Sequence, residues 1–84
     1  MLIYVWNLSP HISEDHFQKT FEAFGQVNFA IISSTILKDR QNGQSRGFAF
    51  VEMPDRAEAQ TAIKNLNRKT IYGRQMVVYG LSEN

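Results

Sequence analysis

The sequence contains no cysteine and no long hydrophobic run. Without cysteine the chain has neither a disulfide framework nor a thiolate metal site, so the fold has to rest on its hydrophobic core. No apolar stretch approaches the length of a transmembrane helix, and no basic and apolar leader precedes the strand-like run at residues 2–5. We therefore expect no membrane association. We expect a cytoplasmic protein, or a nuclear one in a eukaryote, or a domain cut from a longer chain.

Positive charge is also in small excess, because nine Lys and Arg residues stand against eight Asp and Glu residues and give a net charge of +1. This total is weak evidence for a polyanionic partner. The charges are unevenly distributed, however: residues 13–24 have a net charge of −2, residues 38–50 of +2 and residues 64–74 of +4. We therefore expect one side of the folded domain to be basic, although the chain as a whole is nearly neutral.

The chemical groups of an enzyme site are scarce as well. His11 and His16 are the only histidines, and no cysteine can join them as a metal ligand. No nucleophile–base pair, phosphate-cradling loop or pair of carboxylates stands out. We expect no enzyme activity, no cofactor and no metal, and we expect both histidines to be exposed near the start of the first helix.

Two helices are predicted by capping residues and by the spacing of apolar residues. Ser13 suits the N-cap of the first helix, and Gly25 suits the C′ position at its end. Asp55 and Glu58 form a capping-box-like pair at the start of the second helix. The apolar positions expected to face the core are Phe17, Phe21 and Phe24 in the first helix and Ala59, Ala62, Ile63 and Leu66 in the second.

Four strands are predicted at residues 2–6, 27–38, 46–53 and 76–79, which make up one small domain together with the helices. Ser33-Ser34 marks a bulge or bend, Asn42-Gly43 a hairpin turn, and Asn67 to Tyr72 a loop. The order strand, helix, strand, strand, helix, strand predicts an α+β fold. This fold is a ferredoxin-like βαββαβ sandwich, in which both helices cover one face of a four-stranded antiparallel sheet.

The uncovered face of this sheet has an unusual composition. Alternation along residues 46–53 (RGFAFVEM) places Phe48, Phe50 and Glu52 on one face and Ala49, Val51 and Met53 on the other. The same alternation turns Tyr4 and Trp6 of the first strand outward. Four rings on the two central strands then form an apolar patch without helical cover. Flat exposed rings suit unpaired bases, because each base offers a π face for stacking.

These residues resemble the RNA recognition motif family. Residues 46–53 match the octapeptide of the family, and residues 3–8 (IYVWNL) match its hexapeptide, on the expected strands. Phe21, Phe24 and Gly25 are similar to the helix-end pattern of the family, and Gly73-Arg74 is similar to the lead into its last strand. The match covers residues 2–81, which we take as the core of a single domain over residues 1–84.

The resemblance implies roles for the matching residues. Tyr4 and Phe50 are expected to stack on successive bases, Phe48 to pack against sugars or between nucleotides, and Arg46 to pair with the RNA backbone. Gly47 lets the chain enter the strand without a side chain in the way. The candidate RNA-binding residues are Tyr4, Trp6, Asn7, Lys38, Arg40, Arg46, Phe48, Phe50 and Tyr79.

Some positions depart from the family pattern or allow two readings. Trp6 replaces a common glycine and either adds a contact surface near Phe48, lies across the platform and crowds a base, or docks under a loop. Tyr79 either extends the platform or packs on the terminal residues. Lys38 and Arg40 either meet phosphates or are simply solvated. Other departures are Met53, which replaces a frequent aromatic residue, and the long stretch between Gly25 and Gly47, which favours a longer or bulged second strand.

The function expected from the resemblance is a module that binds single-stranded RNA by stacking and by backbone contacts from basic residues. Single-stranded DNA is an alternative ligand in vitro. The second hypothesis is a protein-interaction domain on the same fold, with a protein partner or weak self-association. An enzyme on a ferredoxin-like scaffold is the third and is disfavoured by the missing chemistry.

Overall fold

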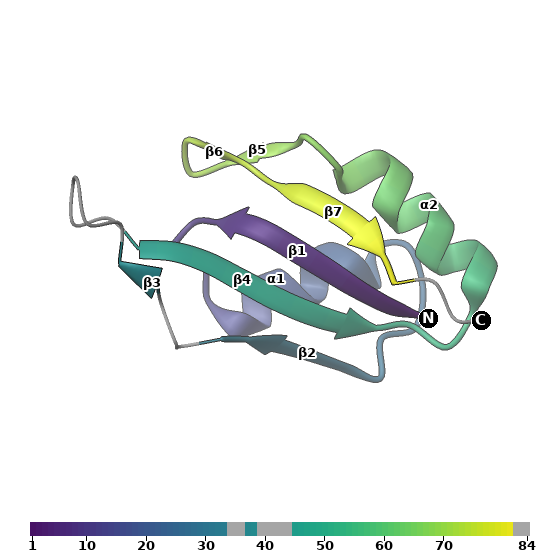
Figure 1. Cartoon of the computed structure of the whole chain (residues 1–84). Coiled ribbons are helices and arrows are strands. Elements are labelled where there is room, and N and C mark those ends of the chain that lie inside the picture. Colours follow the sequence, from purple (N-terminus) through teal and green to yellow (C-terminus); the bar gives the residue numbers. More distant parts are fainter. Residues whose placement is uncertain (34–36, 39–44, 82–84) are drawn as a thin grey trace.

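The computed structural model describes residues 1–33, 37–38 and 45–81. In this part of the chain the elements are β1 (Leu2–Leu8), α1 (Glu14–Glu22), β2 (Phe29–Ile32), β3 (Leu37–Lys38), β4 (Ser45–Glu52), α2 (Arg56–Leu66), β5 (Thr70–Ile71), β6 (Arg74–Gln75) and β7 (Val77–Gly80). Figure 1 shows α1 behind the sheet and α2 alongside β7. The opposite face of the sheet is turned toward the viewer and is covered by neither α1 nor α2.

The main sheet has the strand order β2-β4-β1-β7, with β3 paired to β4. Its strands pair antiparallel, and β1 and β4 are neighbours at the centre, as predicted. Both helices contribute side chains to the same core cluster as the sheet, so they cover the same face. The fold is therefore the predicted α+β, ferredoxin-like βαββαβ sandwich.

The core consists of the residues that alternation assigned to the covered face. The strands contribute Ile3, Val5, Ala49, Val51 and Val78, and the helices contribute Phe17, Phe21, Ala59, Ala62 and Leu66, all at most 2% exposed. Met53 and Met76, which flank strands, are buried as well. Phe24 and Ile63 are only partly buried and pack against this cluster. His11 and His16 are exposed, as expected.

Side-chain caps start both helices as the sequence predicts. The Ser13 hydroxyl accepts a hydrogen bond from the His16 backbone amide at 3.0 Å, and the Asp55 carboxylate accepts one from the Glu58 amide at 3.0 Å. The Glu58 side chain instead accepts from the backbone amide of Gln26 at 3.3 Å, which ties the start of α2 to the segment after α1.

The predicted end of the first helix needs a correction. α1 ends at Glu22 with Ala23 as its C-cap, so Gly25 lies one position beyond C′. The reason for glycine here is close packing: a Cβ atom at Gly25 would collide with the side chain of Glu58.

The bounds of all four predicted strands and of one predicted loop also need correction, and the strand expected at residues 46–53 is β4 at Ser45–Glu52. The single strand expected at residues 27–38 is two strands, β2 and β3, on either side of Ser33; Ser34 and the predicted Asn42-Gly43 turn lie outside the described residues. The expected loop from Asn67 to Tyr72 contains β5, which pairs with β6. Tyr72 and Gly73 connect these strands with φ values of 50° and 79° and so suit a two-residue hairpin turn. In addition, β1 continues to Leu8, and β7 begins at Val77 rather than Met76.

Gly47 and Asn7 mark an irregularity where β1 and β4 meet. The register between the two strands shifts between Trp6 and Leu8, and Asn7 adopts a φ of 59°, a conformation that Asn tolerates better than most residues. A Cβ atom at Gly47 would lie 2.8 Å from the carbonyl oxygen of Leu8. The close approach of the two backbones therefore explains Gly47 on structural grounds.

Candidate nucleic-acid interface

The open side of the sheet carries the four rings that strand alternation assigns to it, together with Tyr79, for which the sequence left two placements open. Tyr4 pairs with Phe50 and Trp6 pairs with Phe48 across β1 and β4, while Tyr4 also pairs with Tyr79 of β7. Directly paired residues share a face, so these rings lie together on the face opposite the core. All five side chains are at least partly exposed. We call Tyr4, Trp6, Phe48, Phe50 and Tyr79 the aromatic face.

Tyr4 is at the centre of the aromatic face. Its ring centroid lies 4.6 Å from that of Phe50, with the rings nearly perpendicular at 88°. The Phe48 ring is 6.0 Å away and almost parallel to Tyr4, and the Tyr79 ring is 5.5 Å away at 26°. Each ring therefore packs against neighbouring rings, which restrict its side-chain rotation. Because of this restriction, less side-chain entropy is lost when a ligand packs on the ring.

Trp6 lies on the same face, at the C-terminal part of β1. Its ring centroid is 5.2 Å from Tyr4 and 5.6 Å from Phe48. The indole Nε1 donates a hydrogen bond to the hydroxyl oxygen of Tyr79 at 2.8 Å. The Trp6 ring thus lies beside both Tyr4 and Phe48 and is bonded to Tyr79 of β7, and its role toward a base stays a prediction. The same contact directs the Tyr79 side chain toward the centre of the face.

Asn7 links the aromatic face to the small hairpin formed by β5 and β6. Its side-chain amide donates to the Gln75 carbonyl oxygen at 2.9 Å, and its own oxygen accepts from the Arg74 guanidinium at 3.3 Å. Asn7 therefore holds β6 against the end of β1. The sequence predicted Asn7 as an RNA-binding residue, and in the structure its side-chain groups are engaged in this link.

The predicted basic residues are only partly covered by the structure. The backbones of Lys38 and Arg46 belong to the paired strands β3 and β4, which places them at the end of the sheet where β1 ends. Their side chains and the whole of Arg40 lie outside the described residues. Their contacts with phosphate stay predictions.

Sequence reasoning missed two apolar residues of the open face, Phe29 and Ile31 of β2, which pair with Glu52 and Phe50. Val77 of β7, which strand alternation turns outward, pairs with Trp6 on the same face. Phe29, Ile31 and Val77 are 42%, 51% and 46% exposed, respectively. Alternation along β2 was the signal that could have found Phe29 and Ile31, but the long predicted strand obscured its register. The open face is therefore apolar from one edge strand to the other.

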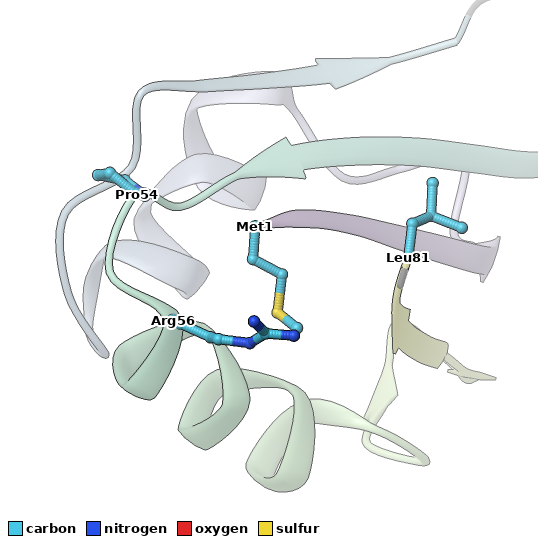
Figure 2. Close-up of a pocket in the computed structure, with 4 residues that line it drawn as sticks. All are labelled: Met1, Pro54, Arg56 and Leu81. Carbon is cyan, nitrogen blue, oxygen red and sulfur yellow. The ribbon is translucent and has the colours of Figure 1, made fainter. Parts of the chain in front are cut away.

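A small pocket lies elsewhere, at the end of the molecule where β1 begins (Figure 2). It has a volume of about 190 Å³ and is lined by Met1, Pro54, Arg56 and Leu81. Close by, the amino group of Met1 donates to the Met53 carbonyl and pairs with the Glu52 carboxylate at 3.2 Å. None of the predicted site residues lines this pocket, so the pocket is separate from the aromatic face.

The comparisons with known proteins agree with this arrangement. The family model for the RNA recognition motif matches residues 3–77, and the chain belongs to this family. Glycine-rich RNA-binding protein 1 of Mycosarcoma maydis is 40% identical over 76 residues, which are 90% of this chain and 41% of that protein. The chain thus spans less than half of that relative.

Solved structures show the same fold. The crystal structure of the RNA-binding protein PG1 is 36% identical and superimposes with a TM-score of 0.76, over 100% of this chain and 96% of that one. A Sxl-lethal protein/RNA complex is 26% identical with a TM-score of 0.76, over 99% of this chain and 47% of that one. Neither helix in the described part of the chain is long and apolar enough to cross a membrane.

Proposed function

We propose that this domain binds single-stranded RNA across the aromatic face. The observation that carries the proposal is the cluster of partly exposed rings on the central strands β1 and β4, with no helix over them. Stacking of an unpaired base on an aromatic side chain contributes roughly 1–3 kcal/mol per base. In this proposal successive bases stack on Tyr4 and Phe50, while Phe48 contacts a sugar.

Relatives that bind RNA by name support the same ligand. Glycine-rich RNA-binding protein 1 is 40% identical to this chain over 76 residues, and the Sxl-lethal protein/RNA complex is 26% identical and has the same fold. In the proposal, Arg46 contacts the RNA backbone, and Lys38 and Arg40 contribute further phosphate contacts. These three cations belong to the stretch with a net charge of +2.

The test combines three ring variants with mapping of the bound surface. Tyr4→Ala, Phe48→Ala and Phe50→Ala are each expected to lower affinity for random-sequence single-stranded RNA, with chemical-shift changes in the wild type confined to the open face. Ala57 is exposed on α2 and is the control position: Ala57→Ser is expected to bind like the wild type. Unchanged affinity in all three ring variants would exclude the aromatic face as the site.

The same titrations test the finer parts of the proposal. We propose that single-stranded DNA also binds to the same rings in vitro, because stacking does not depend on the 2′-hydroxyl group. Shifts on α1 and α2 alone, or no shifts at all with RNA, would point to a protein partner. We also propose a cytoplasmic location, or a nuclear one in a eukaryotic cell, because both compartments hold single-stranded RNA; imaging of the tagged full-length protein tests this.

A further inference from the structure

Trp6 and Tyr79 form a hydrogen-bonded pair at one end of the aromatic face. The Trp6 Nε1–H donates to the Tyr79 oxygen at 2.8 Å, across the neighbouring strands β1 and β7. In the strand register Trp6 lies between Phe48 of β4 and Val77 of β7. The indole is therefore flanked by apolar side chains on both sides and forms the last ring of β1.

This hydrogen bond prepares both side chains for a ligand. The indole has a fixed orientation before any ligand arrives, so stacking a base on it orders fewer degrees of freedom. The Tyr79 hydroxyl accepts from Trp6, and within residues 1–33, 37–38 and 45–81 no acceptor is recorded for its own proton. The hydroxyl is thus able to donate outward, and the bond that it accepts strengthens it as a donor.

Positive charge adjoins this end of the face. Residues 64–74 contain four cations and no acid; three of them, Arg68, Lys69 and Arg74, lie in or directly before the β5–β6 hairpin, and Lys64 belongs to α2. Asn7, next to Trp6 in the chain, is bonded to both residues of β6. The backbones of Arg68 and Lys69 are hydrogen-bonded to the backbone of Met76. Met76 directly precedes Val77, which pairs with Trp6. A strand of nucleotides that continues past Trp6 therefore meets cations, whereas Glu52 lies at the opposite end of the face.

We propose that Trp6 and Tyr79 hold one further nucleotide, beyond the bases on Tyr4 and Phe50. The base of this nucleotide stacks on the Trp6 indole. The Tyr79 hydroxyl donates a hydrogen bond to one of its oxygen atoms, and its phosphate lies toward the cations of residues 64–74. The proposal rests on the RNA binding proposed above and adds a third position with a defined place in the fold.

The first test compares the affinities of matched variants for RNAs of two lengths. Random-sequence dinucleotides and tetranucleotides are titrated by NMR into the wild type, Trp6→Gly and Phe29→Ala. Phe29 is the control because it is an exposed ring on the same face but pairs with Glu52, away from Trp6. The wild type and Phe29→Ala are expected to bind tetranucleotides about tenfold or more tightly than dinucleotides. Trp6→Gly is expected to bind tetranucleotides about tenfold more weakly than the wild type does, so that this gain is lost.

The second test uses the fluorescence of Trp6, which is the only tryptophan in the chain. Tetranucleotides are expected to quench it in the wild type. Tyr79→Phe keeps the ring but removes the hydroxyl, and we expect it to lower tetranucleotide affinity about threefold with little effect on dinucleotides. Trp6→Phe keeps a ring in place of the indole and is expected to retain more of the length gain than Trp6→Gly does.

The outcomes separate this inference from the proposed function. If the wild type binds neither RNA, or if Tyr4→Ala, Phe48→Ala and Phe50→Ala all bind as the wild type does, the function proposed for the aromatic face is wrong. If the wild type binds and Phe50→Ala weakens binding, but Trp6→Gly and Trp6→Phe gain from length as much as the wild type, the third position alone is wrong.

Discussion

The two faces of the sheet are built from the same strands and are both largely apolar, but they differ in side-chain type and in cover. The covered face carries branched and small side chains such as Ile3, Val5 and Ala49, which are fully buried. The open face carries rings such as Tyr4 and Phe50, which stay partly exposed. Branched aliphatic side chains interlock with helices, whereas flat rings offer a surface to another flat group. We therefore expect the covered face to supply most of the stability and the open face to carry the proposed recognition.

The largest expected effect comes from a ring on the covered side. Phe21 is fully buried and contacts Phe17 with a centroid distance of 5.2 Å. Phe21→Ala removes this ring and leaves a cavity, so it is expected to lower the free energy of unfolding by about 3–5 kcal/mol. Urea denaturation followed by circular dichroism measures this loss. A loss below about 1 kcal/mol would mean that the core tolerates the cavity and that the covered face does not hold the fold together.

A ring on the open face is expected to contribute more to RNA binding than to stability. Phe50→Ala removes a stacking surface and is expected to weaken RNA binding by about 1–3 kcal/mol. Its effect on unfolding is expected to be near 1 kcal/mol, because the ring loses only cross-strand contacts such as the one with Tyr4 at 4.6 Å. Fluorescence anisotropy and urea denaturation of the same preparation give both numbers. If Phe50→Ala lowers the free energy of unfolding as much as Phe21→Ala does, the two faces do not differ in their contribution to stability.

Strong local signals made most of the fold predictable from the sequence. Alternation in residues 46–53 assigned both faces of β4 correctly, and Ser13 and Asp55 marked the start of each helix. The split between β2 and β3 and the pairing of β5 with β6 were not predicted. The turn at Tyr72-Gly73 does not look like a hairpin signal, because the first of its two left-handed residues is a tyrosine.

The site was predictable to the extent that it follows strand alternation. Tyr4, Trp6, Phe48 and Phe50 lie where the period of two places them. The hydrogen bond between Trp6 and Tyr79 was not foreseeable, since it joins residues 73 positions apart and depends on the register of β1 with β7. The hydrogen bond between Asn7 and β6 was not foreseeable either, because it requires a hairpin in a segment that the sequence predicts as a loop.

Replacing the charged residue Arg46 is expected to weaken RNA binding less than replacing a ring of the open face. If Arg46 neutralises one phosphate, Arg46→Ala is expected to weaken RNA binding by about 1 kcal/mol and to reduce the slope of log affinity against log salt by about 0.7. Titrations across a range of salt concentrations measure the slope. Arg56→Ala is the control, because Arg56 lines the pocket away from the aromatic face (Figure 2). Equal slopes for Arg46→Ala and the wild type would remove Arg46 from the phosphate contacts.

The smallest expected effect comes from two adjacent isoleucines that lie on opposite faces. Ile31 pairs with Phe50 on the open face and is 51% exposed, whereas Ile32 pairs with Ala49 and packs against the core. Ile31→Ala is expected to change the free energy of unfolding by no more than about 0.5 kcal/mol. The matched Ile32→Ala removes partly buried methyl groups and is expected to cost about 1–2 kcal/mol. Since both residues share the same strand and the same intrinsic propensity, the difference in their urea midpoints isolates the effect of the face. Equal losses would show that the open face contributes to stability through packing that its exposure does not reveal.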